Sequence, residues 1–331
     1  MTGSLLDDVL DRTVVAGFTS LGYRIRSRGW SASALPRMDG KVVLVTGASS
    51  GLGLAAAEGF ARLGATVWLV VRSRERGEQA RLRIAERCGN DDLHVGLCDL
   101  SELESVRRFA EHFRDQASRL DVLVNNAGVM TEAREVSADG IELTFATNVV
   151  GPFLLTNLLM PLLEKSAPAR IINVSSGGMY TQKLRVDDLQ SELGEFDGPK
   201  AYARTKRAEV ILTEIWAEQL AGTGVVVHSM HPGWADTPGV RSSLPRFYAV
   251  TRPLLRTPAQ GADTIVWLGA ATEPGLSSGR LWHDRRPRST NWLPSTRETR
   301  QERERLLAEC ARLSGWRDPS FPMTSIPEGE S

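Results

Sequence analysis

Residues 46–53 read Thr-Gly-Ala-Ser-Ser-Gly-Leu-Gly, and this stretch decides which fold we expect for the 331-residue chain. A β-branched run, residues 42–45, precedes it, and an alanine-rich helical run follows it. A glycine-rich turn between a strand and a helix lets a pyrophosphate approach the backbone amides, and the helix N-terminus adds partial positive charge. The stretch predicts a dinucleotide-binding turn, with a turn that only packs helix on strand as the alternative. The residues expected at the phosphates are Gly47, Ser49, Ser50, Gly51, Leu52 and Gly53.

Short β-branched runs alternate with helical stretches from residue 41 onward, which is typical of a parallel sheet with helices on both faces. The expected strands are 42–45, 66–71, 93–97, 122–125, 170–175, 225–230 and 280–283. The expected helices are 52–63, 75–87, 102–116, 140–163, 201–220 and 258–268. The sequence therefore predicts an α/β, three-layer fold of the Rossmann type, a doubly wound seven-stranded parallel sheet over residues 41–284.

Three segments lie outside this alternation. Residues 1–40 are expected to form an N-terminal helical extension that packs on the main domain or, alternatively, contacts a membrane surface or a partner. Residues 237–258 are rich in proline and arginine and predict a loop-rich insertion able to close over a ligand. Residues 285–331 are expected to form a C-terminal extension with a charged helix near 296–313 and a tail.

Composition excludes several classes of protein. Forty basic residues balance 40 acidic ones, so no nucleic-acid partner is expected. Three cysteines without CxxC spacing and scattered histidines argue against a disulfide framework and against a metal site. The first ten residues do not resemble a cleaved export signal, so we expect a cytoplasmic protein. The apolar run 141–163, which contains Gly151 and Pro152, is interpreted as a buried helix and not as a membrane span.

The end of the second expected strand indicates which cofactor is bound. An acidic residue there would bind a ribose 2′-hydroxyl, whereas an arginine accommodates a 2′-phosphate. This chain has Arg72 and Arg74 at that place. We therefore predict NADP(H) in preference to NAD(H), with both arginines in contact with the cofactor. The alternative is that Arg72 only solvates the end of a strand.

A Tyr-x-x-x-Lys pair, Tyr202 and Lys206, lies inside an expected helix. The chain has only four tyrosines and five lysines, so such a pair is unlikely by accident. Residues four apart share one helix face, which places the ammonium beside the phenol. An ammonium about 4 Å away lowers the pKa of a phenol by up to about three units, since the interaction is worth up to about 4 kcal/mol. The phenol can then exchange a proton with a carbonyl or alcohol oxygen near neutral pH.

With these motifs, in the same order along the chain, stand Asn125-Asn126-Ala127-Gly128, Asn148, Ser175-Ser176 and Pro232-Gly233-x-x-x-Thr237. Together they make the sequence resemble the short-chain dehydrogenase/reductase family, in its single-domain branch, over about residues 40–284. The long spacing between Ser176 and Tyr202 is similar to that of the retinol-dehydrogenase-like group of this family.

The resemblance implies roles for individual residues. Tyr202 would be the general acid/base, Lys206 would lower its pKa and bind the nicotinamide ribose, and Asn148 would anchor a water-mediated proton relay. Ser176 would hydrogen-bond the substrate oxygen, with Ser175 as the alternative. The further cofactor contacts that the resemblance implies are Asp99, Leu100, Asn126, Ala127, Gly128, Tyr202, Lys206, Pro232, Gly233 and Thr237. For Asp99 and Thr237 the alternative is a purely local role, in a helix cap and in a turn.

The resemblance also implies an activity. We expect an oxidoreductase that transfers a hydride between NADP(H) and a carbonyl/alcohol substrate, an apolar aldehyde or ketone, and that assembles as a dimer or tetramer through the helices following Gly140 and Pro199. An apolar substrate wall is expected from Met179, Met230, Trp234, Leu244 and Phe247. One alternative is a non-catalytic dinucleotide-binding sensor or scaffold. A sugar-nucleotide epimerase would need a larger substrate domain than this chain has.

Overall fold

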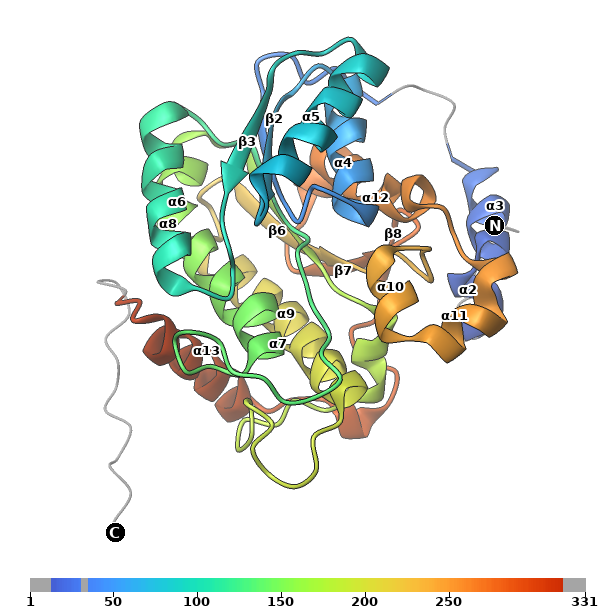
Figure 1. Cartoon of the computed structure of the whole chain (residues 1–331), viewed down its shortest axis with the longest axis vertical. Helices are drawn as coiled ribbons and strands as arrows, with labels where there is room; N and C mark the ends of the chain where they lie inside the picture. Colours follow the sequence, from blue (N-terminus) through green and yellow to red (C-terminus); the bar gives the residue numbers. More distant parts are fainter. Residues whose placement is uncertain (1–12, 31–34, 318–331) are drawn as a thin grey trace.

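The computed structural model describes residues 13–30 and 35–317. These residues form three layers, a single sheet with helices on each of its two faces (Figure 1). The strands pair in the order β3-β2-β1-β4-β5-β6-β7-β8. Their bounds are β1 Val42–Thr46, β2 Thr66–Val71, β3 Leu93–Leu97, β4 Val122–Asn125, β5 Ala169–Val174, β6 Val225–Met230, β7 Arg280–His283 and β8 Arg286–Arg288. Strands β1 to β7 are parallel, and the order reverses between β1 and β4. The predicted doubly wound α/β fold is confirmed, and its ligand crevice lies at the carboxyl ends of β1 and β4.

The prediction of seven strands is one short, because β8 pairs antiparallel with β7. The turn between them holds Asp284 and Arg285 at positive φ, 51° and 57°, a conformation that residues other than glycine rarely adopt. Ion pairs hold both residues in place, Asp284 with Arg256 at 2.5 Å and Arg285 with Asp263 at 2.7 Å. Ion pairs with residues distant in the sequence therefore stabilise the turn that leads into β8, and a local sequence pattern does not reveal such pairs.

Helices cover both faces of the sheet (Figure 1). The helices on one face are α4 Gly51–Arg62, α5 Arg74–Cys88 and α12 Pro258–Ala270, and their apolar side chains share one buried cluster with β1 and β2. The helices on the other face are α6 Leu103–Gln116, α8 Gly151–Lys165 and α9 Gly198–Gln219, which share a second cluster. Each cluster is built from the apolar stripe of amphipathic helices set against β-branched strand residues.

The expected helix over 140–163 forms in three parts. The parts are α7 Leu143–Phe145, the π-helical turn η1 Ala146–Val150 and α8. The stretch Leu143–Lys165 is long and apolar enough to cross a membrane, but 78% of its most apolar window is buried inside the protein. Its apolar character therefore serves the core between α6 and α9.

The insertion over residues 237–258 was predicted to be rich in loops, and this prediction is wrong: the segment is helical. It forms α10 Pro238–Ser243, α11 Pro245–Thr251 and the short η3 Arg252–Leu254. Pro238 and Pro245 each occupy the first position of a helix, where the missing N–H costs nothing and the fixed φ suits the helix. The prolines that suggested a loop thus mark helix starts.

The described part of the N-terminal extension packs on the main domain, one of the two alternatives stated for it. It comprises α2 Val14–Phe18 and α3 Ser20–Ser27, which lie beside α11 in Figure 1. The amide of Trp234 donates to the carbonyl of Phe18 at 2.8 Å, and Arg26 forms a buried ion pair with Asp284 at 2.8 Å. A membrane contact through residues 1–12 lies outside the described residues.

The C-terminal helix, α13 Arg300–Ser314, begins with a capping box between Thr299 and Glu302. It packs against α8 and α9 and buries Leu306 and Cys310. It thereby covers part of the two helices that were expected to form contacts between subunits. The expected dimer or tetramer stays a prediction.

Candidate active site

The glycine-rich turn joins β1 to α4, with Gly47 and Gly51 at positive φ of 68° and 56°. A Cβ atom at Gly53 would lie 2.4 Å from the carbonyl oxygen of Gly47, so only glycine lets α4 start this close to the turn. Ser50 is the N-cap of α4, and the half-buried Ser49 precedes it. Because the first amides of a helix have no acceptor within the helix, they are placed to bind an anion. This backbone cradle fits the phosphates of a dinucleotide.

Arg72 and Arg74 lie where β2 ends and α5 begins, at the same edge of the sheet. The side chain of Arg72 is 66% exposed, and its guanidinium lies 4.0 Å from Oδ2 of Asp99, which follows β3. The other carboxylate oxygen of Asp99 accepts hydrogen bonds from the amide and the hydroxyl of Ser101, at 2.9 and 2.6 Å. Asp99 therefore holds the turn before α6, whose N-cap is Glu102, so it does not have the helix-cap role given above as its alternative, and its Oδ2 lies near Arg72.

The segment after β4 is fastened to the phosphate turn. The side-chain amide of Asn126 donates to the carbonyl of Thr46 at 2.8 Å. The backbone amides of Asn126 and Ala127 donate to the hydroxyl of Thr46, at 2.9 and 3.0 Å. Gly128 follows and is exposed, and a Cβ atom there would lie 3.3 Å from Nζ of Lys206. The end of β4 thus connects the phosphate turn with α9, the helix that carries Lys206.

Several predicted cofactor residues turn their side chains away from the crevice. Leu52 packs toward Gly261 of α12, and Leu100 is buried in the core. The carbonyl of Pro232 accepts a hydrogen bond from Arg256 at 3.2 Å. A Cβ atom at Gly233 would lie 2.6 Å from the same guanidinium. Leu52 and Leu100 therefore offer only their backbone to a cofactor, whereas Arg256 already engages the carbonyl of Pro232 and borders Gly233.

Tyr202 and Lys206 lie on successive turns of α9, whose start is capped by the Asp197 side chain. Nζ of Lys206 is 5.5 Å from the centre of the Tyr202 ring. The ammonium donates to the carbonyl of Val174 at 2.9 Å and to Glu209 Oε1 at 2.7 Å. Burial alone would lower the pKa of Lys206, but Glu209 and Tyr202 outweigh it and raise that pKa above its usual value. The structure therefore brings a charged amine beside the phenol.

The two candidate serines differ in what they contact. Ser175 is buried, and its hydroxyl donates to the backbone carbonyl of Lys206 at 2.8 Å, which ties β5 to α9. Ser176 is only half-buried, and its Oγ accepts from the amide of Gly178 at 3.3 Å. A Cβ atom at Gly178 would lie 3.7 Å from both Ser176 Oγ and the Cβ of Ala203, the residue after Tyr202. This arrangement favours Ser176 as the residue that faces a substrate.

Asn148 lies in the π-helical turn η1, a kind of helix distortion that occurs often at functional sites. Its side chain accepts from the amide of Val129 at 2.8 Å and donates to the carbonyl of Val129 at 3.0 Å. It also donates to the hydroxyl of Thr205 on α9 at 3.0 Å. The side chain of Asn148 thus joins the segment after β4 to α9.

Thr237 approaches the phosphate turn from the other side. It is the N-cap of α10, and its hydroxyl accepts from the amide of Val240 at 3.3 Å, so its local role is to start a helix and not to end a turn, the alternative given above. A Cβ atom at Gly51 would lie 3.4 Å from the side chain of Thr237. The segment after β6 and the glycine-rich turn therefore close on the same crevice.

The expected apolar wall is only partly correct. Met179 and Met230 are completely buried, the latter in the core cluster below the crevice, so their assignment to the wall is wrong. Trp234 and Phe247 are half-buried and pack edge to face, with ring centres 5.0 Å apart. Phe18 of α2 packs against Trp234 at 6.3 Å, and its ring would be 2.5 Å from a Cβ atom at Gly177. An aromatic group contributed by α2, α11 and the segment after β6 thus lies next to Ser176.

Sequence reasoning missed two features of the site. Glu209, the ion-pair partner of Lys206, lies three residues further along α9, and this helical spacing was a usable signal. Phe18 comes from a segment more than 150 residues away in the sequence, and no local pattern predicts its contact with the serine loop.

Comparison with known proteins supports the same interpretation. The family model described as short chain dehydrogenase matches residues 41–246. The chain is 43% identical to human dehydrogenase/reductase SDR family member 12 over 88% of this chain and 92% of that protein. It is 39% identical to human retinol dehydrogenase 14 over 75% of this chain and 79% of that protein.

Solved structures with the same fold contain nicotinamide dinucleotides. The RhlG/NADP active-site complex of Pseudomonas aeruginosa is similar with a TM-score of 0.62 and 27% identity, over 74% of this chain and 94% of that one. A 3-ketoacyl-(acyl-carrier-protein) reductase from Brucella melitensis, complexed with NADH, is similar with a TM-score of 0.60 and 25% identity, over 74% and 96% of the two chains.

Proposed function

Because this chain belongs to the short-chain dehydrogenase/reductase family, we propose that it transfers a hydride between NADP(H) and the carbonyl or alcohol group of an apolar small molecule. The class of enzyme, an oxidoreductase that uses a nicotinamide dinucleotide, follows from the family. The preference for NADP(H), the apolar substrate and the role of Tyr202 as general acid/base are the parts that we propose.

The observation that carries the proposal is the position of Lys206. Its ammonium lies 5.5 Å from the ring of Tyr202 and close to Gly128, the exposed residue after β4. A half-buried phenol with a buried cation beside its ring is suited to proton exchange with a substrate oxygen. A protein that only binds a dinucleotide has no need for this pair, which argues against the sensor or scaffold.

Each polar group then has a distinct task. In carbonyl reduction, the hydroxyl of Tyr202 donates its proton to the substrate oxygen, and in alcohol oxidation it takes that proton back. Ser176 donates a hydrogen bond to the same oxygen and orients it. The positive charge of Lys206 stabilises the phenolate that remains after proton transfer. When bound, the nicotinamide ring supplies or accepts the hydride.

The proposed preference for NADP(H) rests on charge at the end of β2. Arg72 is exposed there, and Arg74 opens α5 beside it, so two guanidinium groups border the place expected for the adenosine ribose. Guanidinium groups bind phosphate by bidentate hydrogen bonds, which a 2′-hydroxyl cannot match. The apolar substrate is supported by the half-buried rings of Trp234 and Phe247, with the buried Phe18 packed behind Trp234, and by the similarity to a retinol dehydrogenase.

The proposal is tested by measuring NADPH oxidation with aldehydes and ketones of graded chain length. We expect turnover that rises with the chain length of the apolar substrate, because a longer chain buries more surface against the rings of Trp234 and Phe247. Tight binding of NADPH with no turnover across the series would favour the sensor or scaffold instead.

A charge reversal tests the cofactor preference. We expect Arg72→Asp to reverse the ratio of kcat/KM for NADPH over NADH, because the carboxylate repels a 2′-phosphate and accepts from a 2′-hydroxyl. Arg83→Asp, an exposed residue more than two turns further along α5, is the matched control and should leave the ratio near that of the wild type. An unchanged ratio in Arg72→Asp contradicts the assignment.

A further inference from the structure

A buried carboxylate, that of Glu209, contacts the lysine of the proposed Tyr202–Lys206 pair on α9. Its Oε1 accepts from the ammonium of Lys206 at 2.7 Å, and both side chains are more than nine-tenths buried. Its other oxygen, Oε2, is buried and has no hydrogen-bond partner among the described residues. A buried carboxylate with one oxygen unpaired is costly, so its retention points to a task beyond packing.

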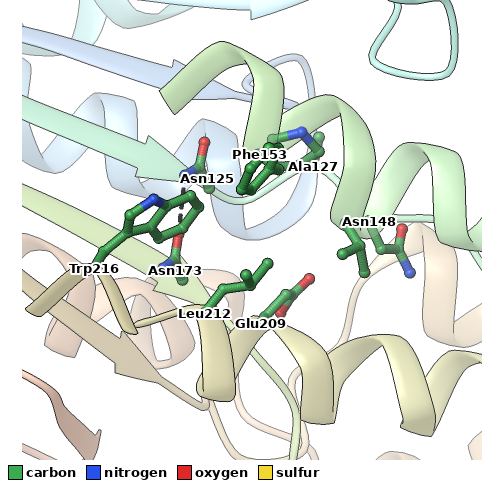
Figure 2. Close-up of a pocket in the computed structure, with 10 residues that line it drawn as sticks. Asn125, Ala127, Asn148, Phe153, Asn173, Glu209, Leu212 and Trp216 are labelled. Atoms are coloured by element: carbon green, nitrogen blue, oxygen red, sulfur yellow. Dashed lines mark hydrogen bonds between the residues drawn. The ribbon is translucent and has the colours of Figure 1, made fainter. Parts of the chain in front are cut away.

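Glu209 also lines a small cavity, of about 10 Å³, between α9 and the segments that carry Asn148 (Figure 2). Three amides, those of Asn125, Asn148 and Asn173, line it together with apolar side chains. Oδ1 of Asn125 is likewise buried without a partner among the described residues. This space accommodates about one water molecule, which can donate hydrogen bonds to acceptors of this kind.

The surroundings of Glu209 isolate its charge. Within the described part of the chain, the titratable groups facing it are Lys206 and, beyond the ammonium, Tyr202, all on α9. The side chains that β4, β5, η1 and α8 present to the cavity are neutral amides or apolar groups. Burial raises the pKa of Glu209 to about 7, while the ammonium of Lys206 opposes that shift. Above neutral pH, Glu209 therefore adds a negative charge next to the ammonium.

We propose that Glu209 is a positioning residue that acts through Lys206: its carboxylate fixes the ammonium and raises the pH at which the Tyr202–Lys206 pair releases its proton. A negative charge stabilises the protonated form of the ammonium that it contacts, so Lys206 keeps its positive charge beside Tyr202 to higher pH. The consequence is a wider pH range in which Tyr202 can donate a proton to a carbonyl oxygen. This inference rests on the proposed function and adds a third ionisable group to its site.

The test compares pH profiles of wild type, Glu209→Gln and Glu209→Asp. Glutamine keeps an oxygen that can accept from Lys206 but removes the charge. We expect the alkaline limb of carbonyl reduction and the acid limb of alcohol oxidation both to move to lower pH, by about one unit or more. Aspartate keeps the charge and should restore most of the shift. Limbs that coincide with those of the wild type in Glu209→Gln would overturn the proposal.

Glu214→Gln is the matched control, because Glu214 lies on the same helix and pairs with Arg303 of α13 at 2.8 Å, away from Lys206. It should leave both limbs in place. A readout without turnover separates this inference from the proposed function. The absorbance change of tyrosine ionisation that disappears in Tyr202→Phe should have its pH midpoint lowered in Glu209→Gln. A midpoint that does not move would contradict the role of Glu209, even in a protein that reduces none of the carbonyl compounds.

Discussion

Two buried carboxylates of this protein differ in how completely they are neutralised. Asp284, in the β7–β8 turn, accepts from Arg256 at 2.5 and 2.9 Å and from Arg26 at 2.8 Å, so both of its oxygens are used. Glu209 has one cation for one of its oxygens. Burial alone would raise the pKa of both groups. The cations around Asp284 instead hold its pKa well below its usual range, whereas the pKa of Glu209 is raised to about 7.

The difference separates a structural charge from an adjustable one. The lowered pKa of Asp284 keeps it ionised at neutral pH, and it joins α3, the segment before α12 and the end of β7. Burial raises the pKa of Glu209 to about 7, and its carboxylate contacts Lys206, the lysine that we propose to act with Tyr202. A fully paired buried carboxylate holds segments together, and a half-paired one can tune its neighbour.

Removal of the structural charge should have the largest effect on stability. Asp284→Asn removes the negative charge that the buried guanidinium groups of Arg26 and Arg256 contact, so we expect a loss of about 3–5 kcal/mol in the free energy of unfolding. Denaturant titration at pH 7 measures it. Asp263→Asn, which breaks the more exposed pair with Arg285, is the control and should cost clearly less. Equal losses in the two variants would show that Asp284 is no more important than a surface partner.

Acid should reduce the effect of Asp284→Asn. Because the pKa of Asp284 is lower in the folded protein than in the unfolded chain, its stabilisation is present above about pH 4 and is lost as the pH falls below that value. The difference in unfolding free energy between wild type and Asp284→Asn should therefore be constant from pH 5 to 8 and shrink at lower pH. A difference that grows toward acid pH would contradict the direction of the shift.

The smallest expected effect concerns Glu209 and is seen by infrared spectroscopy, which detects a protonated carboxyl group. An infrared difference spectrum between wild type and Glu209→Gln should contain a protonated-carboxyl band that disappears with a midpoint near pH 7. The corresponding spectrum for Asp284→Asn should contain no such band at that pH, because Asp284 is ionised there. A Glu209 band absent even at pH 5 would mean that Lys206 keeps this carboxylate fully charged.

The sequence predicted the features that local pattern determines, and it did not predict the features that depend on contacts between distant residues. The part of the fold from β1 to β4 could be predicted, because the glycine-rich turn and these strands follow from local pattern and turn chemistry. Strand β8 could not be predicted, since Asp284 and Arg285 adopt positive φ only with support from Arg256 and Asp263. The helices α10 and α11 were misjudged because proline marks loops and helix starts alike.

In the site, spacing along one helix was informative and contact between distant segments was not. The pair Tyr202 and Lys206 followed from their separation by four residues, and Glu209 could have been found from the same face of α9. Phe18, which packs beside the Ser176 loop, comes from the N-terminal extension, so only the folded structure reveals it. Met179 and Met230 were assigned to the substrate wall from their apolar character, which does not distinguish a pocket from the core.

The central claim is that the hydroxyl of Tyr202, next to the ammonium of Lys206, transfers the proton. The most direct test is the kcat/KM for NADPH-dependent carbonyl reduction by Tyr202→Phe, with Tyr23→Phe on α3 as the matched control. We predict a loss of at least about 100-fold in Tyr202→Phe, with NADPH still bound, and near wild-type activity in Tyr23→Phe. Turnover retained in Tyr202→Phe would contradict the account.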